Sequence, residues 1–230
     1  MLPRNKSFRP RQTNERCFRS TRRLQNSETM RRSKPRLHLA LYARPKHPDA
    51  PHYALLICPK NIPIPLARTT PSQSQSTQTP QALIHKHHVK NTLQVASDGS
   101  GATQPWVYEH ARLASLHEEP RLLLTVAVGK LVESVDKVAA ILERVPFCQG
   151  GGADDEGTQE FDCVEWVRRA VELLRETGAV SGLMEWDGVG EKAMAFLRRE
   201  REGGRWDAGG DGERRIPVLE LIGGAERVVA

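Results

Sequence analysis

The order of strand-like and helix-like patterns along this chain restricts its fold more than any other feature. The strong strand patterns all come before residue 132, and helical periodicity comes after it. The strand-like segments are 37–43, 52–58, 87–95, 105–113 and 121–131, and the helical segments are 135–145, 163–174 and 190–202. Because strands and helices do not alternate, we predict an α+β fold, with an antiparallel sheet of about four to six strands packed by about two or three helices.

The first strand segment has one apolar face. Leu37, Leu39 and Leu41 alternate with His38 and Ala40. A strand with this alternation buries one row of side chains, whereas the continuous apolar run HYALLIC predicts a more buried strand next to it.

Two of the helices begin with a residue that caps a helix. Ser134 precedes one apolar-periodic segment, and Asp162 precedes another, with Glu165 three residues later as in a capping box. Gly178 fits the left-handed residue that follows a helix. These residues predict where the helices start and stop.

Charge separates the beginning of the chain from the rest. Residues 1–50 contain 14 Lys/Arg and 3 Asp/Glu, a balance of +11, whereas the remainder contains 20 and 25, a balance of −5. We therefore expect a disordered basic arm over 1–35 and an α+β domain over 36–202. A low-complexity insertion rich in Pro, Ser and Gln interrupts the domain at 61–83, and a Gly-rich tail follows over 203–230, in which IPVLELIGG fits a final strand or a docking segment.

The basic arm is open to several interpretations: a nuclear signal, a weak nucleic-acid contact or a solvated tail. It lacks the apolar face of a mitochondrial transit peptide and the apolar core of a secretory signal. The four cysteines form no CxxC motif, which favours free thiols and an intracellular, cytoplasmic or nuclear protein. No run approaches the roughly 18 apolar residues of a membrane-spanning helix.

Cys163 occupies the first turn of the best-patterned helix. A helix N-terminus stabilises a thiolate there, whereas the carboxylates of Asp162 and Glu165 oppose it. The same cysteine also continues an apolar stripe through Val167 and Leu174, which is typical of a buried structural cysteine. Both roles remain open from the residues alone.

Histidines supply candidate partners for a catalytic thiol. All eight lie between His38 and His117, and His52 and His88 each open a predicted strand. A cysteine nucleophile needs a base and a polar group that orients the base, and two histidines at neighbouring strand ends can provide both.

Several segments together resemble a family of uncharacterised fungal proteins. These segments are RLHLALYAR, HYALLICPK, HHVKNT, LLLTVAVGKL and FDCVEWVRRAVELL, within about residues 36–200. The histidine strands and the later Cys163 helix also resemble the circularly permuted papain-like thiol fold of lecithin:retinol acyltransferase-like proteins and PPPDE-type isopeptidases. This resemblance implies Cys163 as nucleophile, His52 as general base and His88 as the third polar residue.

The chain departs from that thiol fold in two respects. Asp162 stands where those enzymes commonly have Asn, and Glu165-Trp166 replaces a His-Phe-like pair. The insertion at 61–83 also separates the two histidine strands, so His85 and His87 are alternatives for the role of His88.

The leading hypothesis from the sequence is a cysteine-dependent hydrolase or acyltransferase that forms a thioester on an unidentified substrate. The alternative is a non-catalytic binding or interaction module of the same fold with a structural cysteine. No cofactor is predicted, since Gly150–Gly152 lack the Lys-Ser/Thr of a phosphate loop.

The HKHH stretch, His85 to His88, raises the alternative of a zinc site. No second pair of cysteines or histidines is spaced to complete a tetrahedral set. We therefore interpret it as the polar end of a loop and predict no metal ligands.

Overall fold

A computed structural model describes residues 34–60, 83–91, 93–95, 101–147, 161–206, 215–223 and 226–229. Its strands are β1 (Arg36–Tyr42), β2 (His52–Cys58), β3 (Ile84–Asn91), β4 (Gln94–Val95), β5 (Ala102–Thr103), β6 (Trp106–Leu113), β7 (Leu122–Leu131), β8 (Val180–Ser181), β9 (Val218–Glu220) and β10 (Arg227–Val229). Its helices are α2 (Val135–Glu143), α3 (Cys163–Glu176) and α4 (Trp186–Glu202), with a short 3-10 helix, η1 (Leu116–Glu118).

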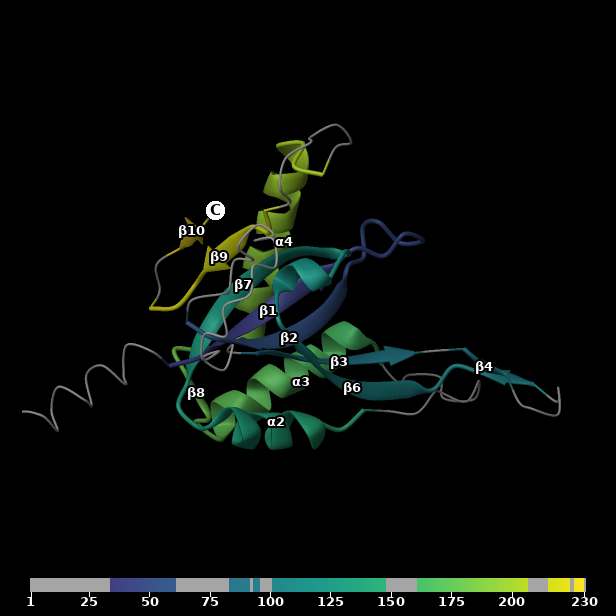
Figure 1. Cartoon of the computed structure of the whole chain (residues 1–230), viewed down its shortest axis with the longest axis horizontal. Helices are drawn as coiled ribbons and strands as arrows, with labels where there is room; N and C mark the ends of the chain where they lie inside the picture. Colours follow the sequence, from purple (N-terminus) through teal and green to yellow (C-terminus); the bar gives the residue numbers. More distant parts are fainter. Residues whose placement is uncertain are drawn as a thin grey trace, which may run out of the picture. The chain divides into compact units, whose positions relative to one another are not determined.

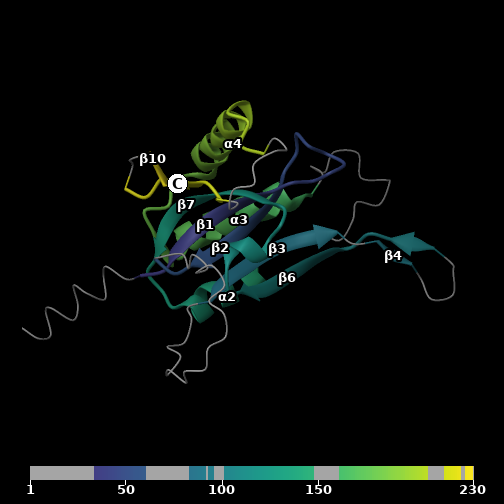
Figure 2. The same cartoon turned by 45° about the horizontal axis from the view of Figure 1, so that its top comes forward.

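One sheet organises the fold. Eight of the described strands form it in the order β10-β9-β7-β1-β2-β3-β6, with β8 pairing to β7. Figures 1 and 2 show β1, β2, β3 and β6 following one another across the sheet. All of the described pairs are antiparallel except β7 with β9, which is parallel.

The predicted α+β class is confirmed, and the sheet is larger than expected. Three α-helices accompany the sheet in the described part of the chain. Of the additional strands, β9 lies within IPVLELIGG, for which a final strand is one of the two predicted interpretations. β8 and β10 are two and three residues long, too short to stand out as alternation in the sequence. β9 and β10 come from segment 203–230 and extend the sheet beyond β7.

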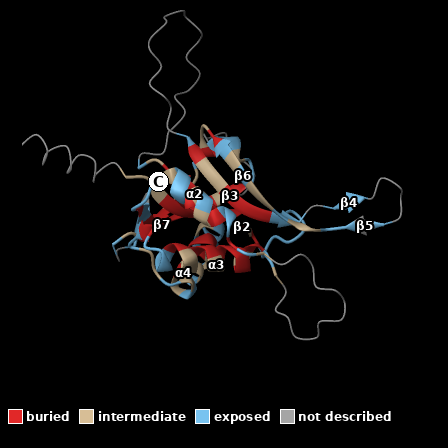
Figure 3. Ribbon diagram, turned by 90° about the horizontal axis from the view of Figure 1, so that it is seen from below, coloured by how far each residue is buried: buried red, intermediate tan, exposed pale blue. Residues whose placement is uncertain are grey.

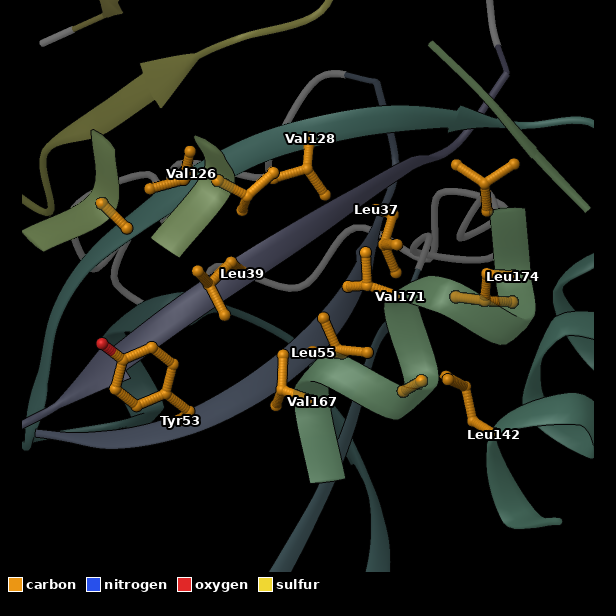
Figure 4. Packing of buried hydrophobic residues seen from close by; sticks show 14 of the residues in the cluster. Leu37, Leu39, Tyr53, Leu55, Val126, Val128, Leu142, Val167, Val171 and Leu174 are labelled. Atoms are coloured by element: carbon orange, nitrogen blue, oxygen red, sulfur yellow. The ribbon is translucent and has the colours of Figure 1, made fainter. Parts of the chain in front are cut away.

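The helices cover one face of the sheet, called the helix-side face below. Leu37 and Leu39 of β1 and Leu55 of β2 share one buried cluster with Val167 and Val171 of α3. Figure 4 shows these side chains between the strands and the helix. Truncating such a buried Leu to Ala typically costs about 2–5 kcal/mol, so each of these leucines contributes substantially to stability.

The second face of the sheet, called the opposite face, is also buried near β1. This corrects the expectation that the first strand has only one buried face, because Ala40 and Tyr42 are buried as well. Leu116 of η1 and Leu122 of β7 join them in a second apolar cluster, with Ile216 packed against it. These covering residues come from distant parts of the chain, so the residue pattern of β1 alone does not predict that this face is buried.

The predicted helix caps are confirmed, with one difference. Ser134 accepts a hydrogen bond from the backbone N–H of Lys137, and Asp162 accepts hydrogen bonds from those of Val164 and Glu165. The Glu165 side chain does not complete a capping box but instead binds guanidinium groups on the next turn of α3.

The last helix begins four residues earlier than the predicted Gly190. Its first residue is Trp186, whose ring lies 6.1 Å from that of Tyr53 in an edge contact. Gly188 and Gly190 lower the intrinsic helix propensity of this turn, which explains the late prediction. Packing of the tryptophan against the core overrides that propensity.

Some sequence expectations fall outside the described residues. These are the basic arm except for Lys34 and Pro35, nearly all of the insertion at 61–83, and the glycines Gly150–Gly152. Within the described part of the chain, none of the helices has the length and apolar character needed to cross a membrane.

His38 is a polar residue in the middle of β1, buried on the opposite face. Its Nδ1 atom lies 3.4 Å from the hydroxyl oxygen of Thr125 on β7. Burial, together with the nearby charge of Arg36, lowers the pKa of His38 to about 3. Between about pH 6.5 and pH 3, this histidine therefore binds a proton in the unfolded chain but not in the folded protein. The free energy of unfolding consequently decreases as the pH falls through this range.

We predict that His38→Leu makes the protein less sensitive to acid. Without this histidine, the loss of unfolding free energy between pH 7 and pH 5 should shrink by about 2 kcal/mol. Urea unfolding at both pH values measures the difference. His117→Leu, at an exposed position, is the control and should leave the loss unchanged. An equal loss in His38→Leu and the unmodified protein would contradict the prediction.

Candidate functional site

The two histidines predicted at neighbouring strand ends lie together. His52 is the first residue of β2, and its Nε2 atom is 2.9 Å from Nδ1 of His88 on β3. His88 Nε2 is in turn 3.7 Å from a carboxylate oxygen of Glu109, which also forms an ion pair with Lys90. Burial is the main cause that lowers the pKa of His52 to about 3 and that of His88 to about 4. This pair is therefore neutral at physiological pH.

Cys163 is the first residue of α3, as predicted, and it is buried among apolar side chains. Burial raises the pKa of its thiol, although a hydrogen bond that the sulfur accepts from the Tyr53 backbone lowers it in part. Asp162 raises the thiol pKa further, and Arg44 lowers it. Among the described residues, no imidazole is one of the groups that shift the pKa of this thiol.

The sheet separates Cys163 from the histidine pair. Tyr53 and Val89 share the apolar cluster of Cys163 on the helix-side face. Side chains alternate between the faces of a strand, so the adjacent His52 and His88 point to the opposite face. The ring of His52 accordingly lies beside Tyr42 of the opposite-face cluster. The structure thus brings together two of the three predicted site residues and not the third.

A second histidine group lies on the helix-side face. His85 and His87 are two residues apart on β3, so they share a face, and His110 of β6 lies directly opposite His87 in the antiparallel register. One ring nitrogen from each of the three lies within 4.8 Å of the others. We call these three residues the histidine cluster.

The histidine cluster is held by ring contacts and hydrogen bonds. His85 Nδ1 is 3.0 Å from His110 Nε2, and the His87 and His110 rings stack with their centroids 4.4 Å apart. His87 Nδ1 is 2.8 Å from the hydroxyl oxygen of Tyr108. Its Nε2 is buried and has no hydrogen-bond partner among the described residues. That nitrogen has an available lone pair when Nδ1 carries the proton.

All three imidazoles favour the neutral form. Burial, followed by the charges of the other histidines, lowers the pKa of His87 to about 3. Burial also lowers the pKa of His85 and of His110, with Arg112 contributing to both. Burial raises the pKa of Tyr108 to about 12, so its hydroxyl stays protonated.

Two carboxylates of α2 lie near the histidine cluster. The negative charge of Asp136 raises the pKa of His85, and that of Glu143 raises the pKa of His110, each against the dominant effect of burial. Glu143 also raises the pKa of Tyr108, in the same direction as burial. The two residues are seven positions apart and therefore project from one face of the helix. The cluster is open on one side, because β6 lies at the edge of the sheet (Figure 3). His110 of this strand is exposed.

Sequence reasoning missed the histidine cluster for an identifiable reason. HKHH is not the polar end of a loop but part of β3, which begins at Ile84. The third histidine, His110, comes from another strand, so spacing within one segment cannot reveal it. Two signals were available in the sequence. The spacing of His85 and His87 places them on one face of a strand, and antiparallel pairing of that strand with the next long strand brings His110 to the same face.

The fold and these two histidine groups define an α+β protein with a histidine-rich sheet. Residues 34–228 match a family of unknown function, DUF6914, and the chain belongs to this family. No curated protein and no solved structure matches the chain. The expected membership of an uncharacterised family is confirmed, whereas the resemblance to the permuted papain-like fold finds no support in the comparisons.

We predict that Cys163 reacts slowly with electrophiles in the folded protein, because its raised pKa keeps the thiol protonated at neutral pH. Iodoacetamide labelling at pH 7.5, read by peptide mass spectrometry, should modify Cys163 only when urea unfolds the chain. Cys58, which is also buried and has a raised pKa, is an internal reference. Fast labelling of folded Cys163 that slows in His52→Ala would contradict the prediction and support a thiol–imidazole pair.

Proposed function

We propose that this protein binds a divalent transition-metal ion, zinc in the first instance, through His85, His87 and His110. The observation that carries the proposal is the approach of three ring nitrogens to within 4.8 Å of one another. Four-coordinate zinc holds its nitrogen ligands at about 2.0–2.1 Å, which places them roughly 3.3 Å apart. The proposal requires side-chain rotations that unstack His87 from His110 and bring the three nitrogens to that spacing.

The chemistry of the cluster supports a transition metal over calcium or magnesium. Imidazole nitrogen suits zinc, copper and nickel, whereas calcium and magnesium prefer oxygen ligands. Metal binding requires unprotonated imidazoles. The lowered pKa values of all three histidines meet this requirement at neutral pH, so no proton has to be displaced.

Tyr108 supports the cluster as a positioning residue. When His87 coordinates through Nε2, its Nδ1–H can donate to the Tyr108 hydroxyl oxygen, 2.8 Å away. Such an outer hydrogen bond fixes the tautomer and the orientation of a ligating imidazole. The unpartnered Nε2 of His87 is consistent with this arrangement.

The number of ligands favours an open site. Three histidines leave the fourth position of a tetrahedral ion to water or substrate, as in catalytic zinc sites. A bound metal lowers the pKa of that water, which makes hydrolysis the reaction class that fits the arrangement. Glu143 and Asp136 of α2 are the nearby carboxylates that would accept the proton of the water.

The cysteine-dependent hydrolase or acyltransferase stays a prediction from the sequence. Two observations favour its alternative, in which Cys163 is structural. The thiol is buried with a raised pKa, and His52 and His88 lie on the other face of the sheet. Under the metal proposal, the hydrolytic nucleophile would be water and not a thiol.

We predict that the full chain, prepared without a histidine tag, binds one zinc ion. Calorimetric titration should show this site, and His87→Ala should weaken it by at least about 100-fold, since losing a ligand costs more than losing its outer partner. Tyr108→Phe should weaken it by about tenfold. Zinc at 100 times its dissociation constant should stabilise the unmodified protein by about 2.7 kcal/mol.

Two matched variants locate the site. His117→Ala removes an exposed histidine, and His52→Ala removes the histidine pair of the opposite face. Both should bind zinc as the unmodified protein does. Zinc binding that survives in His87→Ala and His110→Ala but disappears in His52→Ala would contradict the proposed ligands.

A further inference from the structure

A cavity of about 370 Å³ is lined by none of the residues of the two histidine groups. It lies where the loop between β1 and β2 meets the start of β7 and the end of α4. The lining residues on which the inference depends are Arg44, Pro45, Pro48, Leu123, Arg201 and Trp206. Sites for small ligands begin at about this size and combine apolar walls with a few polar groups.

The charges of this cavity are not balanced. Arg201 Nη1 is 3.1 Å from an Asp49 carboxylate oxygen, and its Nη2 donates to the carbonyl oxygen of Pro48 at 2.8 Å. These bonds fix one guanidinium and neutralise it in part. Arg44 is exposed and forms no ion pair with any described residue. Among the described lining residues, Arg44 therefore contributes a positive charge that no ion pair neutralises.

The rest of the wall is apolar and partly rigid. Pro45 and Pro48 restrict the loop, and Leu123 and Trp206 add to the apolar lining. Trp206 also packs against the main apolar cluster, which holds its ring in place. A flat indole surface next to a guanidinium suits a ligand with an apolar ring and an anionic group.

We propose that this cavity binds a small organic anion, with a planar apolar body against Trp206 and the prolines and a carboxylate or sulfonate on Arg44. The anionic group accepts hydrogen bonds from the Arg44 guanidinium. Arg201 shapes the wall through its bonds to the loop. This inference does not depend on metal binding, because the cavity shares no residue with the histidine cluster.

The test uses two fluorescent probes that differ in charge. Anilinonaphthalene sulfonate is a planar anion, and N-phenyl-1-naphthylamine is a neutral compound of similar shape. The full chain should bind the sulfonate at one site, and Arg44→Ala should weaken that binding by about tenfold, the loss expected for one hydrogen bond to a charged group. The neutral probe should bind more weakly and should not respond to Arg44→Ala.

Arg198→Ala is the matched control, because it removes an exposed arginine from the same helix as Arg201. It should leave binding of the sulfonate unchanged. Circular dichroism of each variant confirms that the fold is retained. Binding of the sulfonate that is unaffected by Arg44→Ala, or that weakens equally in Arg198→Ala, would overturn the proposal.

Discussion

The antiparallel pairing of β3 with β6 fixes which side chains meet on the helix-side face. His87 lies directly opposite His110, and His85 shares their face because it is two residues from His87. A register shift of one residue would turn His110 to the opposite face and leave only two histidines together. His87 also pairs with Leu55 of β2, whose side chain is buried under α3. The burial of that leucine therefore fixes the face of β3 on which His85 and His87 lie.

Side chains alternate between the two faces of the sheet, and this alternation places polar residues of β3 on both faces. His88, the neighbour of His87, points to the opposite face and meets His52 and Glu109 there. Cys163 lies with Tyr53 on the helix-side face, without an imidazole on its thiol. Strand β3 thus contributes His85 and His87 to the histidine cluster on the helix-side face, and His88 to the neutral histidine pair on the opposite face. The histidine cluster and the histidine pair have no residue in common.

Patterns that act over a few residues are sufficient to predict most of this fold. The caps at Ser134 and Asp162 follow from residue type and the apolar spacing after them, and their hydrogen bonds agree. Contacts across the sheet cannot be predicted in this way. The nearness of His110 to His85 depends on how two strands pair, and the burial of Tyr42 depends on Leu116 and Leu122 from later in the chain. The histidine cluster belongs to this second kind of information.

The most direct test of the histidine cluster is anomalous diffraction at the zinc absorption edge. Crystals of the full chain, without an affinity tag, would be grown with an equimolar amount of zinc. The account predicts one anomalous peak about 2.0–2.1 Å from a ring nitrogen of each of His85, His87 and His110, with water or another small ligand in the remaining position. A peak beside His52 and His88, or no peak near the cluster in crystals that contain zinc, would contradict it.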